Sequence, residues 1–263
     1  MKIKKIIKKK KNALIFGVSG QDGAYLASYL LGKGYKVTGT TRDKSKKNLS
    51  RLTRLGIFKK VNIHTGEATN NYFCKKIINR QVNEIYYLAG DSSVVRSFDH
   101  PQQSLQSNTI GILNILEIIK KNKFKTKVFN SGSGQFYGDN KKNKYHLESK
   151  IEPQSPYGVS KAAGYWLTKI YREKYDLFCC TGVLFNHESV LRSKEFVTKK
   201  IIVTAKKIKK NKNIKLRLGN INIYRDWGWA PEYVEAFWLM LQKKRAEDLI
   251  IGSGTVHSLK EFV

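Results

Sequence analysis

A glycine turn between a short apolar run and an amphipathic stretch constrains the fold of this chain more than any other feature. Residues 13–18 are apolar and indicate a buried strand. Glycines follow at positions 17, 20 and 23, after which apolar residues recur with helical period as far as Leu31. Because residues 35–40 indicate a second strand, the segment is one βαβ unit of a parallel sheet. Glycines let backbone N–H groups approach a pyrophosphate, so 17–23 predicts a dinucleotide site.

The alternation of strands and helices continues beyond this unit. Apolar patterns predict further strands at 61–64, 84–89, 127–130 and 177–184, and helices at 71–80, 103–121 and 155–175. Repeated βα units predict an α/β fold, a Rossmann-like doubly wound parallel sheet with helices on both faces.

After Phe185 the pattern loosens, and we expect a smaller, mixed C-terminal substrate domain against the carboxyl edge of the sheet. Its expected elements are a helix at 196–210, a strand at 214–218, a helix at 231–241, a strand at 249–251 and a helix from Ser258. The predicted organisation is a basic tail (1–12), a dinucleotide-binding domain (13–185) and a partial substrate domain (186–263) interleaved with the sheet edge. The substrate domain is expected to be incomplete.

Charge is the most unusual aspect of the composition. Fifty basic and twenty acidic residues give a net charge of +30. The lysines are spread over helix tails and loops and no nucleic-acid motif accompanies them, so we expect general attraction to polyanions but no dedicated nucleic-acid partner. No apolar run is long enough for a membrane helix, so no membrane partner is expected. Three cysteines without disulfide or zinc spacing favour the cytoplasm and no metal site.

Ser155 and Pro156 predict the start of a helix, because serine caps free N–H groups and proline fits the first helical position. On that helix Tyr157 and Lys161 are four residues apart and share one face. An ammonium beside a phenol favours the phenolate, so this pair can exchange a proton with a substrate hydroxyl.

The end of the second strand, where a cofactor's 2′ position is expected, contains Arg42 followed by Asp43. An arginine suits a 2′-phosphate and an acid suits a ribose hydroxyl. Because the arginine comes first, NADP is the predicted cofactor and NAD the alternative.

Together the glycine turn, Ser133 and the Tyr157/Lys161 pair resemble extended short-chain dehydrogenase/reductases of the NAD-dependent epimerase/dehydratase family. Longer strings resemble GDP-mannose 4,6-dehydratases in particular: Phe-Asn-His-Glu-Ser at 185–189, Phe-Val-Thr-Lys-Lys-Ile at 196–201, Arg-Asp-Trp-Gly at 225–228 and the terminal 257–263. The similarity runs from about Asn12 to Val263, and the C-terminal part usual in that family is expected to be missing.

The resemblance implies a lyase that converts a GDP-sugar, GDP-mannose, to its 4-keto-6-deoxy form with an internal NADP hydride cycle. Tyr157 would take the O4 proton, Lys161 would hold the nicotinamide ribose and lower the tyrosine pKa, and Ser133 would supply a hydroxyl. The implied cofactor contacts are Gly17, Val18, Ser19, Gly20, Gln21, Asp22, Arg42, Ser45, Glu67, Leu88, Ser92, Lys161, His187 and Arg192. The implied substrate contacts are Asn186, Lys200 and Arg225, and a homo-oligomer is expected.

One catalytic position departs from the family pattern. Gln135 occupies the place of the glutamate that would remove the C5 proton, and an amide cannot accept that proton at neutral pH. Losing a general base typically costs about 10²–10⁴-fold in rate. Gly90-Asp91 stands where the family has Ala-Gln. Two alternatives therefore stay open: a nucleotide-sugar C4 oxidoreductase or epimerase without dehydration, and a degenerate, non-catalytic nucleotide-binding protein.

Overall fold

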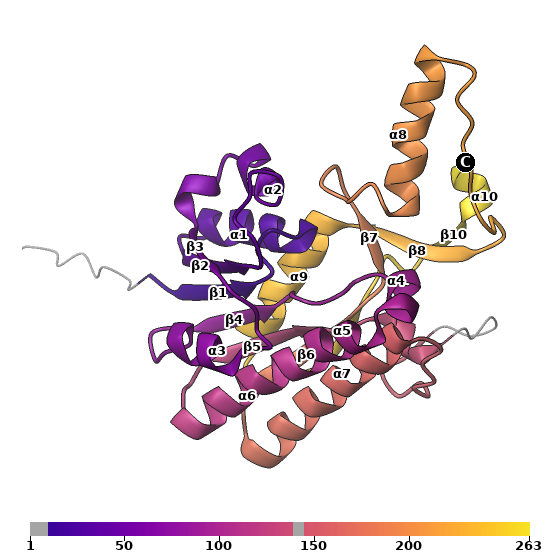
Figure 1. The fold of residues 1–263 in the computed structure, drawn as a ribbon. Coiled ribbons are helices and arrows are strands. Elements are labelled where there is room, and N and C mark those ends of the chain that lie inside the picture. Colours follow the sequence, from indigo (N-terminus) through magenta and orange to yellow (C-terminus); the bar gives the residue numbers. More distant parts are fainter. Residues whose placement is uncertain (1–9, 139–144) are drawn as a thin grey trace, which may run out of the picture.

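The computed structural model describes residues 10–138 and 145–263, and in these ranges a seven-stranded parallel sheet organises the chain (Figure 1). Its order is β3-β2-β1-β4-β5-β6-β9, and every neighbouring pair is parallel. The strands are β1 (Asn12–Phe16), β2 (Lys36–Thr41), β3 (Asn62–Thr65), β4 (Glu84–Tyr87), β5 (Lys127–Ser131), β6 (Cys179–Leu184) and β9 (Leu249–Ile251). The predicted doubly wound sheet is confirmed, and its strand order reverses between β1 and β4, where such folds bind ligands.

Helices cover both faces of this sheet (Figure 1). One layer contains α1 (Gln21–Gly32), α2 (Ser50–Arg54) and α9 (Ala230–Gln242), and the other contains α3 (Asn71–Ile77), α6 (Gly111–Asn122) and α7 (Pro156–Tyr175). Alternate residues of β1 supply the two cores. Ala13 and Ile15 pack with residues of α1 and α9, whereas Leu14 and Phe16 pack with residues of α3 and α6. A strand apolar on both sides is therefore buried on both sides.

A second, smaller sheet has the order β10-β8-β7 and lies beyond the carboxyl edge of the first (Figure 1). Its strands are β7 (Asn186–Glu188), β8 (Tyr224–Trp229) and β10 (Val256–Ser258), with β7–β8 parallel and β8–β10 antiparallel. The carboxylate of Asp226 accepts the N–H groups of Ser253 and Gly254 at 2.9 and 2.8 Å and so fixes the turn before β10. The lysine-rich helix α8 (Val197–Lys210) projects from the body, and α10 (Leu259–Phe262) follows β10.

The predicted helix at 103–121 is three segments in the structure. α5 (Pro101–Leu105) leads into a π-helical turn (Gln106–Ile110), and α6 continues from Gly111. π-turns insert an extra residue into a helix and are frequent at functional sites. Here the turn presents Asn108 to α7, whereas apolar periodicity gave no sign of it.

The strand predicted at 214–218 is wrong. Ile214, Leu216 and Leu218 alternate with exposed residues as a strand would, but the segment pairs with no other strand of the described residues. Sequence periodicity also missed β7, β10, α2 and α4 (Val94–Asp99), because each is short and takes its stability from neighbouring elements. It missed the six-residue β8 as well, because the sequence of that strand does not alternate between apolar and polar residues. Two 3₁₀ turns complete the described elements, at Phe58–Lys60 and Gly134–Tyr137.

Two elements that follow position 185 in sequence complete the large sheet and its helical layer: β9 is an edge strand of that sheet and α9 packs on its face. β9 pairs with β6, and Phe237 of α9 stacks on Phe129 of β5 with ring centroids 4.4 Å apart. At the other end of the chain, Asn12 already lies in β1, and Lys11 pairs with the buried Glu84 at 3.1 Å. Residues 1–9 of the expected basic tail lie outside the described residues.

Within residues 10–138 and 145–263, no helix is both long and apolar enough to cross a membrane. The same ranges hold no group of three His, Cys, Asp or Glu side chains placed to bind a metal ion.

Candidate active site

The N-terminus of α7 carries the central pair of the site. Ser155 Oγ accepts the N–H of Gly158 at 3.0 Å and Pro156 opens the helix, so both start signals act as the sequence predicts. Tyr157 and Lys161 lie one turn apart, each about 8% exposed, with the lysine Nζ 5.8 Å from the tyrosine ring centroid. The pair therefore occupies a dry environment at the carboxyl edge of β5.

Lys161 is held by the last residue of β5. Its Nζ donates to the carbonyl oxygen of Ser131 at 2.8 Å and to the Ser131 hydroxyl at 3.3 Å. Burial lowers the pKa of Lys161 to about 8, while the negative charges of Asp22 and Asp91 act in the opposite direction. The ammonium can therefore lose its proton at mildly alkaline pH.

Tyr157 differs from expectation in its acidity. Burial raises the pKa of the phenol, and this effect exceeds the lowering caused by a hydrogen bond with Ser133 and by the charge of Arg192. Lys161 was expected to lower that pKa, but burial is the largest influence on it and the net shift is upward. At neutral pH the phenol thus holds its proton, as suits a hydrogen-bond donor to a substrate oxygen.

Ser133 and Gln135 lie in the segment that follows β5, and Ser133 shares a hydrogen bond with Tyr157. Ser133 is 6% exposed, and its Oγ accepts the N–H of Gln135 at 3.2 Å, which opens the 3₁₀ turn Gly134–Tyr137. A Cβ on Gly158 would come within 2.9 Å of the Gln135 carbonyl oxygen, so the turn packs closely on α7. The structure therefore brings Ser133 and the backbone of Gln135 to the Tyr157/Lys161 pair.

A polar network that the sequence did not predict holds the backbone of Tyr157 in place. The buried Asn108 donates from Nδ2 to Ser160 Oγ at 3.1 Å, and Ser160 Oγ donates to the Tyr157 carbonyl oxygen at 2.7 Å. Ser97 Oγ accepts the Tyr157 N–H at 3.1 Å. The only sequence signal was polar residues inside otherwise apolar helical patterns.

The glycine turn has the geometry of a phosphate cradle. Gly17 has φ +87°, and a Cβ there would lie 2.9 Å from backbone atoms of Leu88 and Ala89. A Cβ on Gly23 would lie 2.2 Å from the Gly17 carbonyl oxygen. No described side chain caps α1 at Gly20, so its first N–H groups stay available to an anion. These observations fit a dinucleotide pyrophosphate.

The acid in the first turn of α1 is turned toward a histidine. Asp22 Oδ2 lies 2.9 Å from His187 Nε2, while His187 Nδ1 lies 2.8 Å from the Phe185 carbonyl oxygen. An imidazole between two acceptors is favoured in its doubly protonated form. Despite burial, the charge of Asp22 and its hydrogen bond raise the pKa of His187, and His187 in turn lowers the pKa of Asp22.

Gln21 makes the second connection between α1 and this segment, with Nε2 donating to the His187 carbonyl oxygen at 3.2 Å. Its Oε1 accepts from the Ser189 hydroxyl at 2.8 Å. Val18 is fully buried against Gly39, where any Cβ would clash with it at 2.5 Å. Ser19 Oγ lies 3.1 Å from Thr41 Oγ1. In the glycine turn, the glycines thus shape the backbone that can bind a phosphate, whereas the side chains of Val18, Ser19 and Gln21 hold that backbone in place.

At the end of β2, Arg42 is exposed, whereas Asp43 is turned back on its own loop. The Asp43 carboxylate accepts the N–H of Ser45 at 2.8 Å, and this hydrogen bonding lowers its pKa. Arg51, which the sequence analysis missed, donates to the Leu191 and Ser19 carbonyl oxygens at 2.7 and 3.1 Å. It fastens the glycine turn to the 191 loop.

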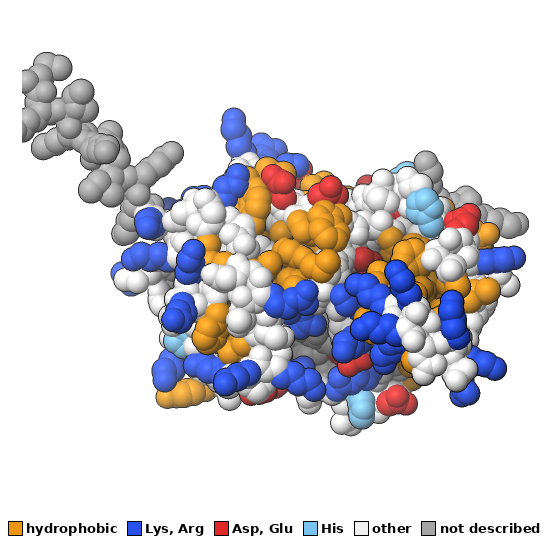
Figure 2. Space-filling view, turned by 90° about the horizontal axis from the view of Figure 1, so that it is seen from above, with side chains coloured by type: hydrophobic (Ala, Val, Ile, Leu, Met, Phe, Trp, Pro, Cys, Tyr) orange, Lys and Arg blue, Asp and Glu red, His pale blue; other side chains and the backbone are white. Residues whose placement is uncertain are grey.

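The remaining predicted residues spread over several elements. Arg192 Nε lies 3.2 Å from Glu188 Oε2, and its guanidinium stacks 3.5 Å from the Phe196 ring centroid. The other residues expected to contact cofactor or substrate are Glu67, exposed after β3; Leu88 and Ser92, after β4; Asn186 on β7; Lys200 on α8; and Arg225 on β8. Seen from above, Lys and Arg side chains gather over α8 (Figure 2).

Comparison with known proteins agrees with this geometry. A family model described as GDP-mannose 4,6 dehydratase matches residues 14–263. This chain belongs to the GDP-mannose 4,6-dehydratase family. It is 38% identical to GDP-mannose 4,6 dehydratase 2 of Caenorhabditis elegans, over 98% of this chain and 70% of that protein. With the human GDP-mannose 4,6 dehydratase it shares 39% identity over 95% of this chain and 70% of the relative.

Solved structures of low sequence identity share the fold of this family member. A UDP-N-acetylglucosamine 4-epimerase from Methanobrevibacter ruminantium matches with TM-score 0.83 at 22% identity, covering 97% of this chain and 80% of that one. A dTDP-glucose 4,6-dehydratase from Bacillus anthracis, in complex with NAD, matches with TM-score 0.82 at 23% identity, covering 95% and 78%.

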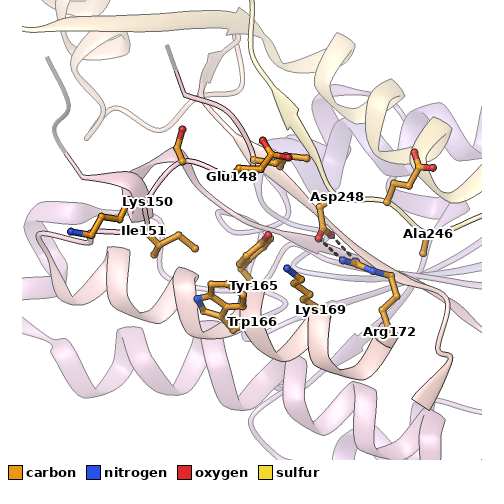
Figure 3. Close-up of a pocket in the computed structure, with 12 residues that line it drawn as sticks. Glu148, Lys150, Ile151, Tyr165, Trp166, Lys169, Arg172, Ala246 and Asp248 are labelled. Atoms are coloured by element: carbon orange, nitrogen blue, oxygen red, sulfur yellow. Dashed lines mark hydrogen bonds and ion pairs between the residues drawn. The ribbon is translucent and has the colours of Figure 1, made fainter. Parts of the chain in front are cut away.

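A cavity of about 570 Å³ lies farther along α7 and includes none of the predicted site residues (Figure 3). Tyr165, Trp166 and Lys169 line one side of it. At its base Asp248 pairs with Arg172 at 2.6 Å and accepts the Thr181 N–H at 2.7 Å, which ties the segment before β9 to β6. The Asp248 contacts therefore stabilise the fold at this cavity.

Proposed function

We propose that this protein is a nucleotide-sugar dehydratase that converts GDP-mannose to GDP-4-keto-6-deoxymannose. The observation that carries the proposal is the convergence of Tyr157, Lys161 and Ser133 at one sheet edge, beside the uncapped N-terminus of α1. In a chain of the GDP-mannose 4,6-dehydratase family, that arrangement suits oxidation of a sugar hydroxyl at C4.

A nicotinamide nucleotide, when bound, accepts hydride from C4 and later donates hydride to C6. The chain's own residues handle protons. Tyr157 exchanges the O4 proton, and Ser133 shares a hydrogen bond with the phenol that steadies it at the same oxygen. Lys161, which Ser131 holds beside the phenol, is placed to bind the ribose of the nicotinamide nucleotide. The buried surroundings exclude water from these transfers.

We further propose NADP as the cofactor, with NAD as the weaker ligand. The Asp43 carboxylate is occupied by the Ser45 N–H, so it is poorly placed to accept ribose hydroxyls, while Arg42 is free to meet a 2′-phosphate. Titration of the protein with NADP and NAD tests this. Arg42→Ala should weaken NADP more than NAD, and equal losses for both would contradict the assignment.

For the substrate we propose that Asn186, Lys200 and Arg225 bind the GDP-sugar. They lie on β7, α8 and β8, and the lysines of α8 give this end of the molecule a positive field that attracts a diphosphate. Arg225→Ala should raise KM for GDP-mannose more than it lowers kcat. An unchanged KM would remove Arg225 from the substrate site.

A homo-oligomer is proposed from an apolar stripe on α7. Val159, Trp166 and Ile170 are spaced as residues of one helix face, and each is 45–46% exposed. Trp166→Glu should shift the mass measured by light scattering toward the monomer.

We propose that the protein is located in the cytoplasm. Its three buried cysteines form no disulfide, which fits a reducing compartment. Cell fractionation would test this location.

The direct test is incubation with GDP-mannose and NADP, followed by NMR of the product. We expect a 4-keto-6-deoxy sugar and loss of one water per sugar. Gln135 favours the second candidate, a C4 oxidoreductase or epimerase, because its amide accepts no proton. A C4 epimer, or net consumption of NADPH with a keto-sugar, would establish that alternative. Nucleotide binding without any turnover would indicate a non-catalytic protein.

A further inference from the structure

Dehydration at C5 and C6 needs a group that accepts the C5 proton, and the amide of Gln135 is unable to do so. The following inference rests on the proposed function and concerns that missing base. Beyond Tyr157 and Lys161, the loop after β4 brings a carboxylate to the same edge of the sheet. That carboxylate is Asp91.

The backbone of Asp91 is locked to the network behind Tyr157. Its N–H donates to Ser107 Oγ at 3.2 Å, and its carbonyl oxygen accepts from Asn108 Nδ2, also at 3.2 Å. The same Nδ2 reaches Ser160 Oγ, which contacts the Tyr157 carbonyl oxygen. Asp91 is therefore positioned relative to Tyr157 through side chains that are themselves buried.

Part of the Asp91 side chain is left without a partner. Its Oδ1 receives a long hydrogen bond of 3.4 Å from the Ser93 N–H. Its Oδ2 is buried and has no hydrogen-bond partner among the described residues, and the same holds for the neighbouring Asn108 Oδ1. Buried acceptors are normally satisfied, so an orphaned carboxylate oxygen at a site edge calls for an explanation, and a catalytic role is one.

The charge of this carboxylate also acts on the catalytic pair. The negative charge of Asp91 contributes to a higher pKa at both Tyr157 and Lys161. Asp22 has the same effect on both groups, but its carboxylate is paired with His187, whereas Asp91 Oδ2 has no partner among the described residues. The Asp91 carboxylate is thus an acceptor whose backbone is tied to that of Tyr157.

We propose that Asp91 Oδ2 is the base that removes the C5 proton of the 4-keto sugar. The C5–H electron pair forms a C4–C5 double bond, and the negative charge moves to O4, where the Tyr157 hydroxyl stabilises it by a hydrogen bond. The enolate then re-forms the 4-keto group and a C5–C6 double bond, which expels the C6 hydroxyl. Protonated Asp91 donates its proton to that hydroxyl, which leaves as water.

The test isolates this proton transfer from hydride transfer. GDP-4-keto-6-deoxymannose is added to the protein in heavy water, and exchange of C5–H for deuterium is followed by NMR. Wild type should catalyse exchange, and Asp91→Asn should slow it by about 10²-fold or more. Asp99→Asn, an exposed carboxylate at the end of α4, is the matched control and should exchange like wild type.

Two further measurements separate a lost base from a damaged fold. Formate should restore exchange in Asp91→Ala without accelerating wild type, and Gln135→Glu should restore at least about tenfold in the Asp91→Asn background. The thermal midpoint of Asp91→Asn should match that of wild type. Equal exchange by wild type and Asp91→Asn, or no exchange by wild type, would overturn the assignment.

The outcome is distinguishable from failure of the proposed function. If the protein makes no keto sugar from GDP-mannose but still exchanges C5–H for deuterium, and this exchange depends on Asp91, the proposed function is wrong and the assignment of Asp91 as the base stands. If Asp91→Asn dehydrates GDP-mannose as fast as wild type does, the proposed function stands and Asp91 is not the base.

Discussion

His187 Nε2 lies 2.9 Å from Asp22 Oδ2, and this ion pair fastens β7 to the first turn of α1 across 165 residues of sequence. It neutralises the acid that would otherwise repel an anion at that helix N-terminus. The pair thus links the glycine turn to the smaller sheet and leaves the α1 N–H groups free for a ligand.

Loss of the His187–Asp22 pair should cost stability in a pH-dependent way. The raised pKa of His187 stabilises the fold fully below its ordinary value of 6.5, and this contribution is lost as pH rises through the raised value. The lowered pKa of Asp22 stabilises above 3.8 and is lost as pH falls. Near pH 6, His187→Gln should cost about 3 kcal/mol, because it strands a largely buried carboxylate.

Urea unfolding of both proteins checks this difference, which should shrink as pH rises to about 9. Asp22→Asn in the same background should recover part of the loss, since it removes the stranded charge. A difference between the two proteins that does not change with pH would contradict the ion pair.

Lys161 should set an alkaline limit on activity. Because burial lowers its pKa to about 8, against 10.5 in water, the ammonium loses its proton as pH rises through about 8. The value of kcat/KM should therefore fall about tenfold per pH unit above that point. The arginine of Lys161→Arg keeps its positive charge, so any activity of this variant should not fall as pH rises above 8. A wild-type profile that is flat to pH 10 would refute the role.

Tyr157→Phe should abolish proton exchange with O4 while leaving the fold intact. We expect turnover to drop by about 10²–10⁴-fold, equal to about 3–5.5 kcal/mol of barrier, with little change in nucleotide affinity. Tyr165→Phe, two turns along the same helix and outside the site, is the matched control and should remain active. Comparable activities of the two variants would show that the phenol is not the proton-transfer group.

Gly23→Ala should disrupt the nucleotide cradle. A Cβ would lie 2.2 Å from the Gly17 carbonyl oxygen, so the turn must shift away from α1, and NADP affinity should fall at least about tenfold. In the same helix, Gly32→Ala meets no atom within 4 Å and should stabilise the protein by about 0.5 kcal/mol. Calorimetric titration and thermal unfolding measure the two effects; an unaffected NADP affinity in Gly23→Ala would contradict the cradle.

Local pattern was sufficient for the parallel sheet and for most of its helices. The apolar runs of β1, β4, β5 and β6 predict buried strands because both of their faces are covered. The glycine spacing and the Ser155–Pro156 start predict where the two functional helices begin, since these signals depend on backbone geometry within a few residues.

Tertiary structure decided which sequence patterns form helices or strands and which polar residues contact one another. Residues 214–218 alternate as a strand does but find no partner, while the short β7 exists because β8 pairs with it. The sequence placed Tyr157, Lys161, Ser133 and Gln135 in one site. Only packing showed that burial, not the lysine, governs the acidity of Tyr157, and that the Asp91 backbone is tied to Asn108. Pairing, burial and charge act between residues far apart in sequence, so no local pattern encodes them.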